Sequence, residues 1–175
     1  LSEKNLRQWQ KNIGYVPQDV FLTDASIQQN IAFGENNTEI SKQKIQKSAK
    51  LADIDNFIEN DLKNGYQTIV GERGVRLSGG QKQRIGIARA LYHDPKVLVL
   101  DEATSALDTK TEQNIMKSLG RLARKKTIII IAHRITTLQN CDTIIVLSLG
   151  KIVGKGTYDE LKSKNRIFKK LISYK

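Results

Sequence analysis

The chain lacks any apolar run long enough to cross a membrane as a helix. A spanning helix needs about 20 consecutive apolar residues, whereas the longest candidates, residues 127–132 and 143–147, have the length of strands. Only one cysteine is present, Cys141, which excludes an internal disulfide and favours a reducing compartment. No signal peptide, internal repeat or low-complexity tract is visible. These absences leave a globular chain of 175 residues, enough for one domain with a hydrophobic core and a small subdomain.

A basic block interleaved with aromatic residues, which is typical of proteins that stack nucleic-acid bases, is also missing. Lysine and arginine number 29 against 18 acidic residues, which gives a formal charge of +11. Such a charge is compatible with nucleic acid, with an anionic membrane surface or with a general basic bias. Because the lysines are spread along the whole length, we interpret most of them as solvated, with attraction to a membrane surface as the second alternative. No nucleic-acid partner is expected.

Short apolar runs alternate with amphipathic segments, which predicts an α/β fold. Strands are expected at residues 11–17, 97–100, 127–132 and 143–147. Amphipathic helices are expected from Gly79 to the residues before Asp94 and from about Lys110 onward. Continuously apolar strands separated by such helices predict a mostly parallel sheet that is covered on both faces.

The rest of the chain predicts shorter elements. Residues 19–94 are helical and irregular, with Ser41 as an N-cap and a glycine-punctuated loop at 65–74. A turn at 149–151 leads into a short strand at 152–153. Terminal helices are expected at residues 2–10, 158–163 and 167–173.

Two runs carry the chemistry. Leu77–Gln81 reads Leu-Ser-Gly-Gly-Gln and places a hydroxyl group and glycine N–H groups at the mouth of a helix, where a phosphate is well bound. Asp101 and Glu102 follow the apolar strand 97–100, where two carboxylates can hold magnesium and an attacking water. Each has a plain alternative, because Ser78 could simply be an N-cap and the acids could cap the next helix.

His133 ends the apolar strand 127–132. A lone histidine at a strand end is usually a satisfied polar residue. However, it comes one strand after the acidic pair, and the carboxyl ends of parallel strands meet at the edge where ligands collect.

These runs, with the helix residues Gln83, Arg84 and Ala88–Ala90, resemble the ATP-binding cassette (ABC) family over essentially all 175 residues. The resemblance implies a P-loop NTPase-like sheet flanked by helices, with an inserted α-helical subdomain and an incomplete core. Residues 1–18 and 95–175 would be a partial RecA-like ATP-binding core, and residues 19–94 the helical signature subdomain.

The resemblance also implies ATP and Mg²⁺ as ligands. Glu102 would activate the attacking water as the catalytic base, and His133 would hydrogen-bond the γ-phosphate. Asp101 and Gln18 would hold magnesium. The ATP-binding residues would be Gln18, Ser78, Gly79, Gly80, Gln81, Asp108 and His133.

Three loops are implied to link the chain to partners. The loop 103–108 would cross to a second subunit, although Asp108 could equally be the N-cap of the helix at 110. Gln18 would sense magnesium and connect to a transmembrane domain. Glu72, in a Gly-Glu-Arg-Gly run typical of exporters, would touch the partner's intracellular helices, with an ordinary solvated glutamate as the alternative.

One motif is missing: no Gly-x-x-x-x-Gly-Lys-Ser/Thr run occurs in the chain. Because the chain also starts at Leu1 within a helix-like pattern, it is expected to be the C-terminal part of the nucleotide-binding domain of an ABC exporter. This domain would lie at the cytoplasmic face of the inner membrane, facing a second domain head to tail. The chain alone is expected to be an inactive ATPase.

The alternatives are a soluble ABC-type ATPase acting on nucleic acid or ribosomes, and a non-catalytic interaction fragment. The run from Trp9 to Phe33 is similar to exporters that flip lipid-linked glycans.

Overall fold

The computed structural model describes residues 3–123, 125–132 and 134–173. The chain divides into two compact units between Ile131 and Ala132, and each is described by itself. In the described part of the chain, no helix combines the length and the apolar character that a membrane crossing requires.

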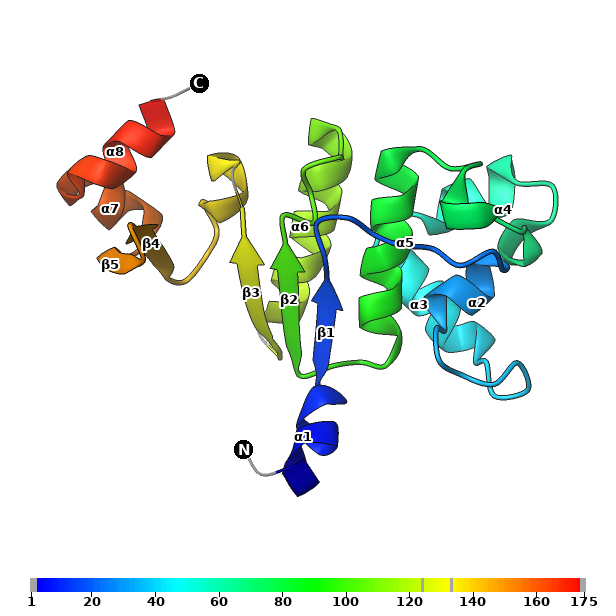
Figure 1. Ribbon diagram of the computed structural model, residues 1–175. Coiled ribbons are helices and arrows are strands. Elements are labelled where there is room, and N and C mark those ends of the chain that lie inside the picture. The colour runs from blue at the N-terminus through cyan, green and yellow to red at the C-terminus, as the bar shows by residue number, and fades with distance from the viewer. Residues whose placement is uncertain (1–2, 124, 133, 174–175) are drawn as a thin grey trace. The chain divides into compact units, whose positions relative to one another are not determined.

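The first unit contains a three-stranded parallel sheet in the order β1 (Ile13–Val16), β2 (Val97–Asp101) and β3 (Thr127–Ile131) (Figure 1). Ile13 lies opposite Val97, and Val97 lies opposite Thr127, so the three strands start together, and β1 ends one residue before β2 and β3. The prediction of an α/β fold with a parallel sheet is therefore confirmed.

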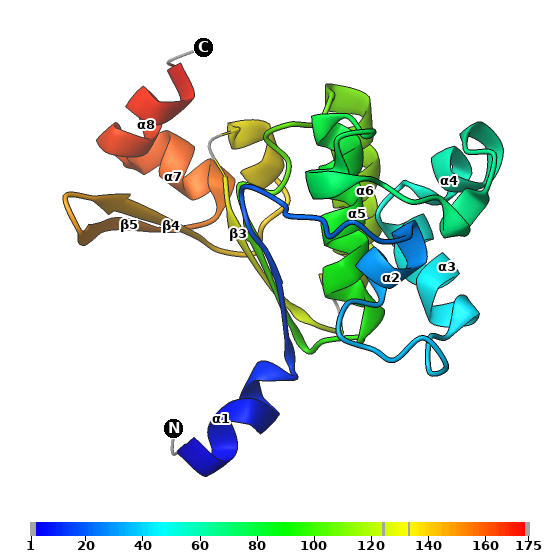
Figure 2. The ribbon, with the colours of Figure 1, turned by 45° about the vertical axis from the view of Figure 1, so that its right-hand side comes forward.

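Two helices cover one face of this sheet, α5 (Gly79–Tyr92) and α6 (Thr109–Ala123) (Figure 2). The side chains of Leu98 and Leu100 are at most 1% exposed, whereas Ile129 and Ile131 of β3 are about half exposed, 49% and 50%. The prediction that both faces are covered was wrong for the described residues of the first unit. The apolar run predicts burial, but α5 and α6 pack on one side only.

The segment between β1 and α5 is helical, as expected. It contains α2 (Ile27–Ile31), α3 (Lys42–Leu51) and α4 (Asp55–Asp61). Ser41 caps α3 by accepting a hydrogen bond from the Lys44 N–H. The expected loop at 65–74 holds two short 3-10 turns, η1 (Gly65–Gln67) and η2 (Glu72–Gly74). The boundaries proposed for the core and the helical subdomain, 1–18 with 95–175 and 19–94, stay a prediction.

Helix α1 (Glu3–Gln10) precedes β1. Two glycines, Gly14 in β1 and Gly86 in α5, allow β1 and the segment after it to pack closely against α5. A β-carbon at Gly14 would lie 2.5 Å from the carbonyl oxygen of Ala90. A β-carbon at Gly86 would lie 2.5 Å from a Val20 methyl group. Larger residues at these positions would push β1 and the segment after it away from the helix.

The second unit holds a hairpin of β4 (Ile144–Ser148) and β5 (Lys151–Gly156), a 3-10 turn η3 (Ile135–Leu138), and the helices α7 (Tyr158–Lys164) and α8 (Arg166–Ser173). The strand expected at 143–147 is present as β4. However, it pairs antiparallel with β5 instead of extending the parallel sheet of the described residues. Leu149 and Gly150 both have positive φ, 48° and 73°, which is the two-residue turn that matches hairpin twist.

A small core supports this unit. Ile144, Val146, Leu161 and Phe168 are buried together. Cys141 is half-buried and packs against them, which agrees with a structural role for this side chain.

Candidate functional site

The predicted phosphate segment opens α5. Ser78 is the N-cap, and its hydroxyl oxygen accepts a hydrogen bond from the Gln81 N–H at 3.2 Å. In return the Gln81 side-chain oxygen accepts from the Ser78 N–H at 2.8 Å, which completes a capping box. The interpretation of Ser78 as an N-cap is therefore confirmed. This cap does not exclude anion binding, because the first N–H groups of a helix have no acceptor within the helix and the Ser78 hydroxyl group still has a proton to donate.

The two glycines of this segment pack beside the loop 103–108. A β-carbon at Gly80 would lie 3.3 Å from the Ala106 carbonyl oxygen and 3.5 Å from a Leu107 methyl group. A β-carbon at Gly79 would meet the Ala106 β-carbon at 3.8 Å. The signature segment and the loop expected to cross to a partner are thus neighbours within one chain.

The two predicted carboxylates stand at the carboxyl end of β2. Asp101 is its last residue, and both Asp101 and Glu102 are half-buried. Glu102 has φ +50°, a conformation that is uncommon for residues other than glycine. Its N–H donates to the Ile131 carbonyl oxygen at 2.9 Å, and its carbonyl oxygen accepts from the Ser105 N–H at 3.0 Å. The backbone at Glu102 is therefore held from both sides.

Tyr15 is a neighbour of Asp101 that the sequence motifs did not single out. Its hydroxyl group donates to an Asp101 carboxylate oxygen at 3.0 Å, and this bond with the nearby charge raises the pKa of Tyr15. The signal was available in the strand pattern. Tyr15 pairs with Val99, so it shares a sheet face with Asp101 two residues further along β2.

The topology gathers these groups at one edge of the sheet (Figure 1). α5 leads into β2 through the short connection 93–96, so the start of α5 and the end of β2 lie at the same edge. β1 also ends there, and exposed Gln18 follows it by two residues. His133 lies outside the described residues.

Asp108 caps α6. Its carboxylate accepts from the Thr111 N–H at 3.0 Å and from the Thr111 hydroxyl group at 2.6 Å. These bonds lower the pKa of Asp108. The N-cap interpretation is correct, and a role of exposed Asp108 toward ATP stays a prediction.

Glu72 is exposed at the start of a 3-10 turn between two glycines with positive φ, Gly71 and Gly74. Two large apolar side chains whose exposure the sequence did not reveal are Phe21 and Phe33, with 60% and 54% of their surfaces exposed. Both residues contact Arg89, and we call this pair the apolar patch. Arg89 of α5 holds the patch in place. It donates to the Phe21 carbonyl oxygen at 2.9 Å and lies 5.0 Å above the Phe33 ring.

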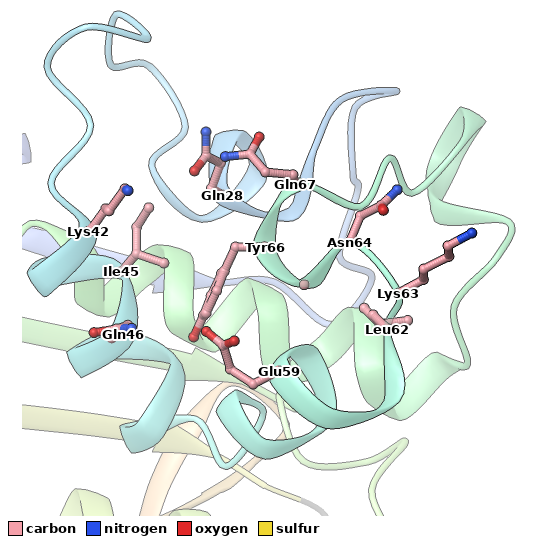
Figure 3. Close-up of a pocket in the computed structure, with 11 residues that line it drawn as sticks. Gln28, Lys42, Ile45, Gln46, Glu59, Leu62, Lys63, Asn64, Tyr66 and Gln67 are labelled. Atoms are coloured by element: carbon pink, nitrogen blue, oxygen red, sulfur yellow. The ribbon is translucent and has the colours of Figure 1, made fainter.

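A cavity with a volume of about 460 Å³ lies elsewhere, between α3, α4 and the turn 65–67 (Figure 3). The Tyr66 hydroxyl group donates to Asp55 at 2.6 Å, and burial with this bond raises the pKa of Tyr66. None of the predicted site residues lines this cavity.

The donor set at the sheet edge suits magnesium better than a metal that needs many protein ligands. Among the described residues, no three His, Cys, Asp or Glu side chains cluster as a metal site. Mg²⁺ is usually held by one or two carboxylates, with waters and phosphate oxygens completing its shell. Asp101 with the amide of Gln18 fits that pattern.

Residues 1–105 match the sequence profile of the ABC transporter family. The chain belongs to the ABC transporter family. It is 47% identical over 170 residues to ABC transporter B family member 14 of Arabidopsis thaliana, covering 97% of this chain and 13% of that protein. It is 46% identical over 167 residues to multidrug resistance protein pgp-1 of Caenorhabditis elegans, covering 95% of this chain and 13% of that protein.

A solved structure of a bacterial Atm1-family ABC exporter with ATP bound is also similar. Its TM-score is 0.89 at 40% identity, over 99% of this chain and 30% of that chain. The ABC resemblance and the P-loop NTPase-type fold are thereby confirmed, and the family implies ATP binding, a transmembrane domain and paired nucleotide-binding domains. Because the chain spans about 13% of the two relatives' length, the activity of a whole transporter is a proposal. The glycan-flippase resemblance stays a prediction.

Proposed function

We propose that residues 1–175 are the C-terminal part of the nucleotide-binding domain of an ABC exporter, which hydrolyses ATP to move a substrate across a membrane. The observation that carries the proposal is the shared sheet edge. There the capped start of α5 and the acid pair Asp101–Glu102 come together in a chain of this family.

The start of α5 would contribute to one half of a shared site. Gly79 and Gly80 carry no side chain that could shield the N–H groups of the first helical turn, and the helix dipole favours an anion there. Ser78 would donate its hydroxyl proton to a phosphate oxygen while it still accepts from Gln81. The ATP bound here would be held by a facing, head-to-tail domain.

The acid pair would serve the second, equivalent site of the head-to-tail pair, where the facing domain supplies its own start of α5. Asp101, oriented by Tyr15, would hold Mg²⁺ together with Gln18, and the ion would neutralise phosphate charge. Glu102 would accept a proton from the attacking water. Its backbone is fixed to β3 and to Ser105, so the carboxylate position would be set before ATP arrives. His133 would contact the γ-phosphate.

Movement would pass from this site to a transmembrane domain. A β-carbon at Gly80 would lie only 3.3 Å from the Ala106 carbonyl oxygen, so the closely packed loop 103–108 and α5 would shift together when the domains close. The transmembrane helices would dock on three features of this chain at the cytoplasmic face of the inner membrane. These are Gln18, Glu72 and the apolar patch of Phe21 and Phe33. Exposed aromatic side chains held by a half-buried arginine suit such an interface.

Glu102→Gln in the longer polypeptide that carries this chain tests the proposal. Loss of the general base should slow ATP hydrolysis by roughly 10² to 10⁴-fold and trap the ATP-loaded, closed dimer. Phosphate release and size-exclusion chromatography with ATP report the two effects. Glu39→Gln removes an exposed carboxylate outside the site and should leave both unchanged.

Hydrolysis at the normal rate in Glu102→Gln removes Glu102 from the base role. Strong, salt-sensitive binding of DNA or RNA by the same polypeptide would instead favour the nucleic-acid ATPase.

A further inference from the structure

A second cavity lies at the opposite edge of the sheet from the acid pair. It has a volume of about 190 Å³ and opens between α3, α5 and α6. Its residues Asp94 and Lys126 precede β2 and β3, whereas Asp101 ends β2. A strand of five residues at about 3.3 Å per residue separates the two edges. The cavity is therefore distinct from the proposed nucleotide site.

The cavity is lined both by leucines, here called the floor, and by lysines, here called the rim. The leucines are Leu51, Leu91 and Leu122. The lysines are Lys44, Lys47 and Lys126, and Asp94 is the only carboxylate among the lining residues. The rim therefore carries an excess of two positive charges over an apolar surface.

Lys126 is held in place. Its ammonium group lies 2.9 Å from an Asp94 carboxylate oxygen and donates to the Pro95 carbonyl oxygen at 2.5 Å. Its side chain is 10% exposed, whereas the Asp94 side chain is 71% exposed. All three lysines contribute to lowering the pKa of Asp94, which agrees with a positive potential around it.

The other two lysines, Lys44 and Lys47, lie on α3. They are three residues apart, so they share one face of that helix. Lys44 lies 5.8 Å above the Tyr92 ring, a weak cation–π contact at an exposed site. A lysine that only shields leucines would extend its ammonium group into water, whereas the ammonium group of Lys126 is held at Asp94 and that of Lys44 lies over the Tyr92 ring.

We infer that this lysine cavity binds a small organic anion, whose phosphate or carboxylate group meets the three lysines while its apolar body rests on the leucine floor. The volume indicates a small ligand. It exceeds the roughly 10–15 Å³ that a single water needs but lies below the roughly 300–1,000 Å³ of sites for drug-sized molecules, so phenyl phosphate is a suitable probe.

Asp94 makes the inference specific, because its carboxylate already pairs with Lys126, one of the three lysines of the cavity. Asp94→Asn should therefore tighten anion binding, as it frees Lys126 and removes a like charge. Asp94 has φ +51°, and asparagine tolerates this conformation well, so the variant should fold.

Titration of the 175-residue chain with phenyl phosphate, followed by leucine methyl NMR, tests the site. We expect saturable shifts at Leu51, Leu91 and Leu122, with no shift at Leu77 or Leu107 near the start of α5. Lys44→Gln/Lys47→Gln should weaken binding by roughly tenfold, and Asp94→Asn should tighten it several-fold. Lys50→Gln, which changes an exposed lysine of α3 outside the cavity, is the matched control and should bind like the parent chain.

Phenol and inorganic phosphate separate the two halves of the ligand, and both should bind more weakly than phenyl phosphate. Thermal unfolding of each variant reports whether it is folded. The inference is overturned by an absence of saturable shifts, by equal binding of phenol and phenyl phosphate, by a double variant that binds like Lys50→Gln, or by unchanged or weaker binding in Asp94→Asn.

Discussion

The Ser78 hydroxyl group illustrates how one residue can serve stability and chemistry at once. Its oxygen accepts a hydrogen bond from the Gln81 N–H and so caps the exposed start of α5. The same oxygen can donate its proton outward. A substitution that keeps the cap but adds a negative charge should separate the two roles.

Ser78→Ala should lower the free energy of unfolding by about 1 kcal/mol, because an N-cap acceptor is lost. Ser78→Asp should stay within about 0.5 kcal/mol of the parent, because aspartate is an equally good N-cap. Urea unfolding of the 175-residue chain measures both.

In the longer polypeptide, Ser78→Asp should nevertheless abolish ATP-driven dimer closure, since a carboxylate repels phosphate. Ser41→Ala removes the cap of α3 and is the matched control, with a similar stability loss and normal closure. Normal closure in Ser78→Asp would leave Ser78 with its capping role only.

At the scale of elements, α5 organises the first unit. The segment after β1 packs on it at Gly86, the loop 103–108 packs at Gly80, and Arg89 ties down Phe21 and Phe33. Burial lowers the pKa of the Arg89 guanidinium, but its hydrogen bonds to backbone carbonyl groups keep it satisfied. Through these contacts, α5 packs against the loop at the sheet edge and also against the apolar patch.

Gly86→Ala should destabilise the chain by about 1–3 kcal/mol, because the new methyl group overlaps Val20. Val20 is β-branched and stiff, so relief requires movement of the backbone. This cost exceeds the gain of up to about 1 kcal/mol from replacing glycine within a helix. Thermal or urea unfolding measures the change.

Gly120→Ala in α6 is the control. No described heavy atom lies within 4 Å of its added β-carbon, apart from the neighbouring helix backbone, so this variant should be more stable by about 0.5–1 kcal/mol. Stabilisation in both variants would show that Val20 does not press on α5.

The strand β3 is the outer strand of the described parallel sheet, and it exposes two isoleucines on the face away from α5 and α6. Long apolar edge strands promote association with other chains. The five-residue apolar run 127–131 predicts a strand buried on both faces. We therefore expect another polypeptide segment to pack on the exposed face of β3.

At the scale of the whole molecule, the sequence contains the start of α5 and the acid pair but no Gly-x-x-x-x-Gly-Lys-Ser/Thr loop. Residues that hold a triphosphate act together, so half of them should confer little affinity. The charge of +11 does not replace this loop, because dispersed surface charges attract anions without positioning them.

The 175-residue chain should therefore neither hydrolyse ATP nor gain thermal stability from it. Phosphate release and thermal unfolding, each with millimolar Mg²⁺ and ATP, check this. Magnesium-dependent turnover that disappears in Glu102→Gln would contradict the expectation, and it would mean that the phosphates are bound by residues other than a P-loop.

Helix caps and strands could be predicted from the sequence because they depend on residues within a few positions of one another. The capping residues Ser41 and Ser78 lie three residues from the N–H groups that they accept, and the apolar runs 97–100 and 127–131 have the period and length of strands. The hairpin pairing of β4 could not be read from periodicity, because an apolar strand suits either sheet and the turn at Leu149–Gly150 decides.

By itself, the sequence determined which groups could handle a phosphate and that each would stand at the end of a strand or the start of a helix, because those properties depend on residues within a few positions of one another. Only the tertiary structure decided which of these groups touch. The bond from Tyr15 to Asp101 spans 86 positions, and the contacts of Gly80 with Ala106 and of Arg89 with Phe33 likewise join distant segments. Such contacts depend on how sheet and helices pack, and no local pattern of residue types encodes that packing.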